Sequence, residues 1–167
     1  MKKMTEDNLK NAFAGESQAH LKYMSFADKA AAENFPNVAR LFKAASYSEQ
    51  VHAANHLKTL SGIGKTSENL AGAMAGENFE VAEMYDAYMA VADRQGEKEA
   101  KMRFHAASEA EKVHSGLYAR AKEAVDKGKD ADLRAVQVCS ICGFTVEGDA
   151  PDKCPICGAP KEKFVKF

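Results

Sequence analysis

The first 130 residues contain an internal repeat, which strongly limits what this chain can fold into. Residues 8–16 return as residues 69–77, 61 positions later, and residues 42–52 return as residues 104–114, 62 positions later. Two related halves of this kind predict two helical hairpins that face each other across a pseudo-two-fold axis. The repeated positions would then meet at the centre of one domain.

The same region has the composition of long helices. It is rich in Ala, Glu, Lys and Met, and Pro36 is its only proline. Proline and glycine divide it into four expected helices, at residues 5–33, 36–60, 66–95 and 97–127. The hydroxyls of Thr66 and Ser67 are available to cap the third. Helices this long are rarely stable alone, so we expect an all-α four-helix bundle.

Six polar positions recur in the repeat and point to a metal site. They are Glu16, Glu49, His52, Glu77, Glu111 and His114. Each Glu-x-x-His pair spans three residues, so both side chains leave the same helix face. A lone pair of this kind is usually a solvated surface. However, one Glu from each of two helices and Glu-x-x-His from each of the other two is the di-iron carboxylate pattern. Several unpaired carboxylates in a core would be too costly without cations between them.

One carboxylate breaks the symmetry of the repeat. Glu80 follows Glu77 by three residues on the same face, where the first half has Ala19. We expect Glu80 to add a carboxylate near the metals, although a solvated position is the alternative.

The composition changes near residue 130, which predicts a second domain. Residues 1–130 form the bundle, 131–135 a linker, and 136–167 a small module with three of the four prolines. The module contains all four cysteines, in two Cys-x-x-Cys-Gly knuckles: Cys139, Cys142, Cys154 and Cys157. Paired knuckles predict one tetrahedral thiolate site. Beside a di-iron bundle we favour a redox-active iron there, with structural zinc as the alternative.

Charge and hydropathy exclude several functional classes. The formal net charge is -1, so no basic surface indicates nucleic acid or an anionic membrane as a partner. No apolar run approaches a membrane span, and the N-terminus lacks the apolar stretch of a signal peptide. We therefore expect a cytoplasmic protein, in which cysteines bind metal more often than they form disulfides.

Together these motifs resemble the rubrerythrin family over the whole chain. The matching segments are residues 14–20, Glu49-x-x-His52, Gly76-Glu77-x-x-Glu80, Glu111-x-x-His114 and the two cysteine knuckles. The resemblance implies a ferritin-like di-iron bundle with a C-terminal rubredoxin-like domain. It implies that Glu49 and Glu111 bridge two irons, that Glu16 is a terminal ligand of one, and that Glu77 and His114 are ligands of the other. His52 and Glu80 would be alternative ligands of one iron, and the four cysteines would hold a single iron.

The resemblance also implies a function. It predicts a non-haem di-iron peroxidase that reduces hydrogen peroxide to water and protects against oxidative stress. Electrons would come from an external rubredoxin or an NAD(P)H-linked reductase and pass through the thiolate iron. Tyr23 and Tyr85 are candidates to hydrogen-bond near the irons. We expect a homodimer or larger assembly in which the tail reaches a partner's site. A ferritin-like ferroxidase or iron-handling protein is the alternative.

Overall fold

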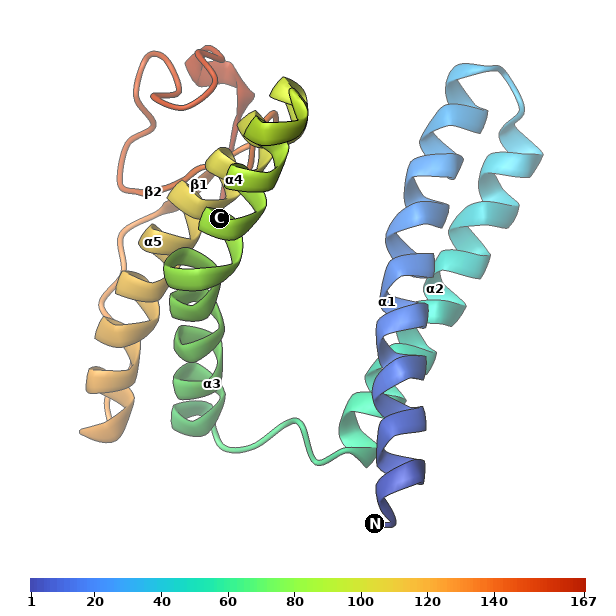
Figure 1. Cartoon of the computed structure of the whole chain (residues 1–167), viewed down its shortest axis with the longest axis horizontal. Coiled ribbons are helices and arrows are strands. Elements are labelled where there is room, and N and C mark those ends of the chain that lie inside the picture. Colours follow the sequence, from blue (N-terminus) through green and yellow to red (C-terminus); the bar gives the residue numbers. More distant parts are fainter. The chain divides into compact units, whose positions relative to one another are not determined.

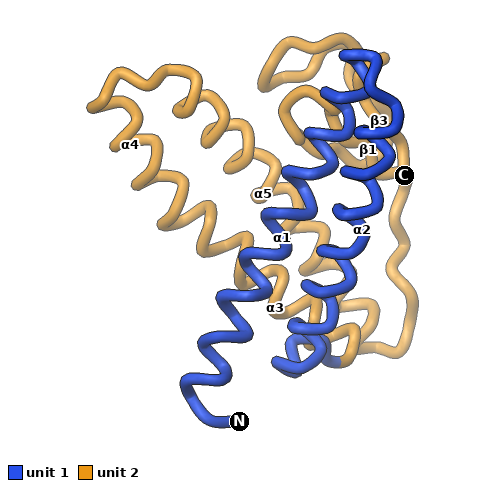
Figure 2. Tube along the Cα trace, turned by 90° about the vertical axis from the view of Figure 1, so that its right-hand side faces the viewer, with its two compact units in different colours: residues 1–64 blue, residues 65–167 orange.

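The computed structural model describes residues 1–167 and divides them into two compact units, residues 1–64 and residues 65–167 (Figure 2). The division falls between the two halves of the sequence repeat. Each unit is built around one helical hairpin (Figure 1). No helix combines the length and the apolar character that crossing a lipid bilayer requires. The expected boundaries of the bundle, linker and module stay a prediction.

The first unit is a hairpin of α1 (Lys3–Ala32) and α2 (Pro36–Thr59) (Figure 1). Asn34 adopts a left-handed conformation (φ 62°) in the connection, and Pro36 occupies the first turn of α2, where its missing N–H is no loss. The buried residues are small, Ala27, Ala30, Ala39, Ser46 and Ala53, which allows the helices to approach closely.

Larger apolar side chains of this hairpin remain on its surface. Leu21 and Leu41 are each 67% exposed and Met24 is 40% exposed. An apolar surface of this kind marks a site of further packing. A single hairpin of a four-helix bundle is expected to present such a face.

The second unit begins with a long helical segment in three parts: α3 (Thr66–Phe79), the π-helical turn η1 (Glu80–Met84) and α4 (Tyr85–Gln95). Gly96 ends it in a left-handed conformation (φ 75°), and α5 (Lys98–Asp126) returns alongside. The expected cap by Ser67 is wrong, because its hydroxyl bonds to Asp126 on α5 instead. The carboxylate of Glu68 accepts the N–H of Lys65 at 2.7 Å and caps the helix in its place.

The π-helical turn explains why the repeat has two different offsets. Glu16 and Glu77, before the turn, are 61 residues apart, whereas Tyr23 and Tyr85, after it, are 62 apart. The second hairpin therefore carries one additional residue, and a wide turn absorbs one residue without rotating the helix beyond it. Equivalent aromatic clusters follow in both units: Tyr23, Phe26 and Phe42 in the first, and Tyr85, Tyr88 and Phe104 in the second.

The C-terminal module is a small antiparallel sheet with the strand order β2-β1-β3. Its strands are β1 (Val136–Cys139), β2 (Thr145–Glu147) and β3 (Phe164–Lys166), and the short 3-10 helix η2 (Lys161–Lys163) precedes the last. Strand β2 lies against α5 of the same unit. The module is thereby connected to the helix that carries the second Glu-x-x-His pair.

Candidate metal centre

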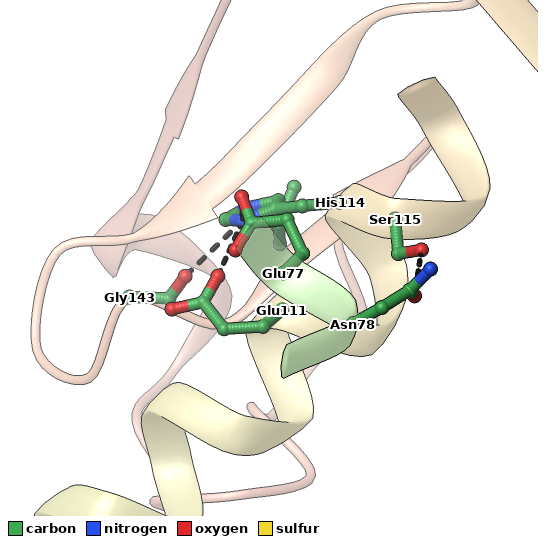
Figure 3. Close-up of polar contacts among 7 residues, drawn as sticks. Glu77, Asn78, Glu111, His114, Ser115 and Gly143 are labelled. Atoms are coloured by element: carbon green, nitrogen blue, oxygen red, sulfur yellow. Dashed lines mark hydrogen bonds and ion pairs between the residues drawn. The ribbon is translucent and has the colours of Figure 1, made fainter. Parts of the chain in front are cut away.

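In the second unit, three of the expected ligands come together. Glu77 projects from α3, and Glu111 and His114 project from one face of α5 (Figure 3). The Nδ1 atom of His114 lies 2.7 Å from Oε2 of Glu111 and 3.6 Å from Oε1 of Glu77. One ligand atom from each residue lies within 4.8 Å of the others. We call these three residues the α3–α5 half-site.

The α3–α5 half-site concentrates carboxylates in a poorly solvated place. Burial raises the pKa of Glu77 to about 7, and the neighbouring charge of Glu111 acts in the same direction. Burial and Glu111 also raise the pKa of Glu80. Carboxylates that resist ionisation in this way are stabilised by a bound cation, which replaces the protons and neutralises the charge.

Glu80 and Tyr85 lie close to the same carboxylates. Glu80 is the first residue of the π-helical turn, and its pKa responds to the charge of Glu111. Burial raises the pKa of Tyr85, and the charges of Glu80 and Glu111 add to this effect. Both expected residues are therefore near the half-site. The phenol of Tyr85 keeps its proton and can donate a hydrogen bond there.

The imidazole of His114 is held from both sides. Its Nε2 atom lies 2.7 Å from Oγ1 of Thr145 on β2, and that hydroxyl donates to the carbonyl oxygen of Gly143 at 3.2 Å. A threonine hydroxyl has one proton to donate. The oxygen of that hydroxyl remains available to Nε2 of His114. The Nδ1 atom of His114 faces the carboxylates, where a cation could bind it.

The first unit contains the equivalent cluster, formed by Glu16 on α1 and by Glu49 and His52 on α2. Their ligand atoms also lie within 4.8 Å of one another. His52 Nδ1 lies 2.9 Å from Oε2 of Glu49, but the His52 side chain is 52% exposed, compared with 29% for His114. We call these three residues the α1–α2 half-site. Its histidine is held only from within its own helix.

Tyr23 belongs to the aromatic cluster of the first unit. It packs against Phe26 and Phe42, with ring centroids 6.2 Å away in each case, and its expected place near the irons stays a prediction. Its counterpart Tyr85 also belongs to an aromatic cluster, but interacts with the carboxylates of its half-site as well.

Two residues near the α3–α5 half-site were not among those expected from the sequence. Tyr118 lies near His114, with ring centroids 6.4 Å apart. Burial raises the pKa of Tyr118, and the charges of Glu77 and Glu111 raise it further. Its spacing of four residues from His114 was a usable signal, because it places both on one helix face. Thr145 had no such signal, since 31 residues separate it from His114.

The four cysteines form the expected cluster in the module. The sulfurs of Cys139 and Cys157 are 3.7 Å apart, and those of Cys142 and Cys154 are 3.6 Å apart. Four sulfurs at about 2.3 Å from a tetrahedral metal lie about 3.8 Å from one another, so the geometry fits a thiolate-bound ion. Burial raises the pKa of the Cys142 thiol, and a bound metal cation would deprotonate it.

The glycine after each knuckle has the left-handed conformation that the turn requires. Gly143 (φ 82°) and Gly158 (φ 74°) donate their N–H groups to the carbonyl oxygens of Cys139 and Cys154, at 2.8 and 2.9 Å. A side chain at either position would strain this backbone. The turns bring both cysteines of each knuckle to the same side.

Three contacts connect the module to α5 of its own chain. Arg103 donates to the carbonyl oxygen of Ile141 at 3.3 Å, His114 contacts Thr145, and Arg120 forms an ion pair with Glu147. From the sequence, the tail is expected to reach a partner's site. That assembly stays a prediction; within its own chain, the module lies beside the α3–α5 half-site.

Comparisons with known proteins agree with both parts of the structure. The family model described as Rubrerythrin matches residues 7–122, and the model described as Rubrerythrin, rubredoxin-like domain, matches residues 137–165. Rubrerythrin-2 of Clostridium acetobutylicum is 41% identical over 98% of this chain and 97% of its own length. Nigerythrin of Nitratidesulfovibrio vulgaris is 32% identical over 98% of this chain and 86% of its own length.

Solved structures support the same assignment. Nigerythrin in a partially reduced state and in the fully reduced, all-ferrous state each match with a TM-score of 0.56, at 32% identity over 98% of this chain and 86% of theirs. The predicted fold class is confirmed: a ferritin-like helical domain with candidate di-iron ligands precedes a rubredoxin-like module with a four-cysteine site. The chain therefore belongs to the rubrerythrin family.

Proposed function

We propose that this chain is a peroxidase that reduces hydrogen peroxide to water and protects against oxidative stress. The ligands of the α1–α2 half-site and of the α3–α5 half-site would hold two non-haem irons, and the four cysteines would hold a third iron. When bound, the paired irons supply the electrons that cleave the O–O bond. The reaction consumes one peroxide, two protons and two electrons, and yields two waters.

The observation that carries this proposal is the position of the four-cysteine module. It lies against α5 and contacts the half-site residue His114 through Thr145. A ferroxidase, which takes its electrons from ferrous iron in solution, has no need of a one-electron centre at that position. A peroxidase needs one, because each turnover must return two electrons to the irons. The mixed-valent and all-ferrous structures of nigerythrin support redox chemistry in this relative.

We assign the ligands on the pattern of the repeat. Glu49 and Glu111, the carboxylates of the Glu-x-x-His pairs, would be the shared ligands, and Glu16, Glu77 and His114 would be the terminal ones. His52 and Glu80 are alternative ligands of one iron, which the exposure of His52 supports. An anionic oxygen ligand suits ferric iron and an imidazole suits ferrous iron, so such an exchange follows the oxidation state.

Protein side chains also manage the protons of the reaction. Tyr85 and Tyr118 both retain their phenolic protons beside the carboxylates of the α3–α5 half-site. Tyr85 can therefore donate a hydrogen bond to an oxygen of bound peroxide. Glu77, whose pKa is about 7 without metal, can exchange a proton near neutral pH before metal binds.

The electrons enter from outside the chain. We propose an external rubredoxin or an NAD(P)H-linked reductase as the donor to the thiolate iron. We also propose that the protein acts as a homo-oligomer, since large apolar side chains such as Leu21 and Leu41 remain exposed on the first unit.

The test is anaerobic rapid mixing of the fully reduced, iron-loaded chain with stoichiometric hydrogen peroxide. The colour of the ferric tetrathiolate centre reports when that centre loses its electron. We expect it to appear within the mixing experiment, and much faster with peroxide than with dioxygen. A centre that stays reduced, or that reacts faster with dioxygen, would favour the ferroxidase or iron-handling function. Metal analysis of the purified chain distinguishes thiolate iron from zinc, which cannot carry electrons.

A further inference from the structure

A groove between α4 and α5 brings together two methionines and a histidine. The groove has a volume of about 430 Å³, and Met89, Met102 and His105 all lie along it. It belongs to the second unit, and no residue of either half-site lines it. The thioether sulfur of methionine and the imidazole nitrogen of histidine are neutral donors, and thioethers in particular select soft metal ions.

The geometry of the hairpin explains why these three side chains share one groove. Met102 and His105 are three residues apart on α5, so they leave the same helix face. Met89 lies seven residues before the turn at Gly96, and the two residues of α5 lie six and nine residues after it. At 1.5 Å per residue, those positions on two antiparallel helices differ in height by only about 1.5 to 3 Å. The three donors therefore lie at one level of the groove.

The repeat shows that the hairpin does not need Met102 and His105 for packing. At a shift of 62 residues, the first hairpin has Arg40 at the position of Met102 and Lys43 at the position of His105. Arg40 and Lys43 are both exposed, so this side of their hairpin tolerates charged side chains. Met102 is 49% exposed at the equivalent place, and a thioether gains little from burial there.

The charges along the groove disfavour the cations that carboxylates usually bind. Asp93 is its only carboxylate, and it is already paired with Lys101 at 2.5 Å. The remaining charged side chain on the walls is Lys98. Its repulsion grows in proportion to the charge of the incoming ion, so it opposes a divalent cation more than a monovalent one.

We propose that Met89, Met102 and His105 form a binding site for one soft monovalent cation, Cu⁺. Two thioethers and one imidazole supply three neutral donors, which suit a soft ion of single charge. This site lies apart from both half-sites and from the four cysteines. It is independent of the proposed peroxidase function, so either proposal can fail without the other.

The test is a titration of Ag⁺, a redox-stable substitute for Cu⁺, into the full chain loaded with zinc. Zinc is diamagnetic and occupies the four cysteines, which would otherwise capture a soft ion. NMR of isotope-labelled methionine methyl groups follows each sulfur separately. We expect the signals of Met89 and Met102 to shift together and to level off at one equivalent. The signal of Met4, which is 77% exposed, should stay in place.

Variants distinguish a shared ion from separate contacts. Met102→Leu removes one sulfur and nearly keeps the shape, and it should abolish the shift at Met89. His105→Gln removes the imidazole and should weaken binding, so that both shifts need more Ag⁺. Met4→Leu is the matched control and should leave the titration unchanged. Ca²⁺ should move none of these signals, because Asp93 is paired with Lys101.

Three results would overturn the site. The first is a shift at Met89 that persists in Met102→Leu, because the two sulfurs would then not bind one ion. The second is a shift at Met4 as large as those in the groove, which would indicate unselective binding to exposed thioethers. The third is release of zinc, measured with a chelating dye, without any shift of Met89 and Met102. In that case the soft ion binds the cysteines alone.

Discussion

The guanidinium group of Arg120 pairs with the carboxylate of Glu147 on β2. Arg120 lies on α5, six residues after His114. Glu147 also accepts the backbone N–H of Arg134 at 3.1 Å. The Arg134 N–H and the charge of Arg120 lower the pKa of the Glu147 carboxyl, although desolvation opposes them. The module therefore contacts α5 through the ion pair of Glu147 and through the hydroxyl of Thr145, which bonds to His114.

Removing the charged contact should loosen the module without unfolding it. Because the Arg120 side chain is 58% exposed, we expect Glu147→Gln to slow oxidation of the thiolate iron by no more than about fivefold, and high salt to have a similar effect on the wild type. Stopped-flow measurements at low and high salt check this. The matched control is Glu123→Gln, which breaks the pair with Lys127 on the same helix and should change nothing. A salt-independent rate in the wild type would contradict the prediction.

The π-helical turn makes a prediction about deletions. Deleting Ala82 from η1 should convert the segment into a regular α-helix while keeping the residues on both sides in register. We expect its thermal midpoint to stay within a few degrees of the wild type, a change of about 1 kcal/mol. Ala75 lies in the regular helix α3. Its deletion should instead rotate the preceding part of α3 by about 100° relative to the part that follows, and should lower the thermal midpoint strongly.

Both deletions are compared by calorimetry of the metal-free chain. Equal losses of stability in the two variants would show that the turn does not absorb the additional residue. The Ala82 deletion also tests whether the wide turn is needed for function, since iron binding by Glu80 can be measured in a chain that still folds.

The raised pKa of Glu77 predicts how pH affects the metal-free chain. Glu77 titrates at about 7 when folded and near its ordinary value of 4.5 when unfolded. Between these values the folded chain holds more protons, so its free energy of unfolding should fall as the pH rises from 4.5 to 7. Urea unfolding measures this free energy, which should fall less between pH 4.5 and 7 in Glu77→Gln than in the wild type. The exposed Glu83, changed to Gln, serves as the control.

Metal binding should reverse this dependence. The cation binds the ionised carboxylate, so its affinity should increase with pH until Glu77 is fully ionised, above about pH 7. A titration with Co²⁺ at about pH 6 and about pH 8, on either side of that value, measures the difference. Equal affinities at the two values would mean that Glu77 is already ionised in the metal-free chain.

The four-cysteine module should depend on its metal for folding. Its sheet is small, and Cys139 and Cys154 are among its few fully buried side chains, at 1% and 3% exposure. We expect Cys154→Ser to abolish the thiolate site and to unfold the module while the helices persist. Amide hydrogen exchange should show lost protection at Val138 and unchanged protection at Ala106 on α5. Loss of protection in both places would mean that the helices also need the module.

Much of the fold could be predicted because its signals are local. Pro36 and Gly96 mark helix ends through their own backbone preferences, and the structure places helix boundaries there. The Glu-x-x-His spacing placed Glu111 and His114 on one face for the same reason. The two cysteine knuckles also have local geometry, and their sulfurs lie together as expected.

The rest depended on contacts between distant segments. The hydroxyl of Ser67 donates a hydrogen bond to Asp126 on another helix, so it does not cap its own helix as the local sequence predicted. Thr145 meets His114 only because the module folds back on α5. The π-helical turn could be predicted only in part. The change of offset from 61 to 62 shows that the second half contains one additional residue, but it does not say how the helix absorbs that residue.

The same turn bears on how such a chain came into being. Two hairpins with matching glutamates, histidines and aromatic clusters are what duplication of a single gene segment would produce, and such a protein would begin with two equal metal positions. One inserted codon within residues 78–84 is enough to account for the shift between the halves. The only half with the additional residue is also the only one with a carboxylate at the position of Glu80. A symmetric ancestor could thus have gained two unequal iron positions from a single inserted codon and one substitution.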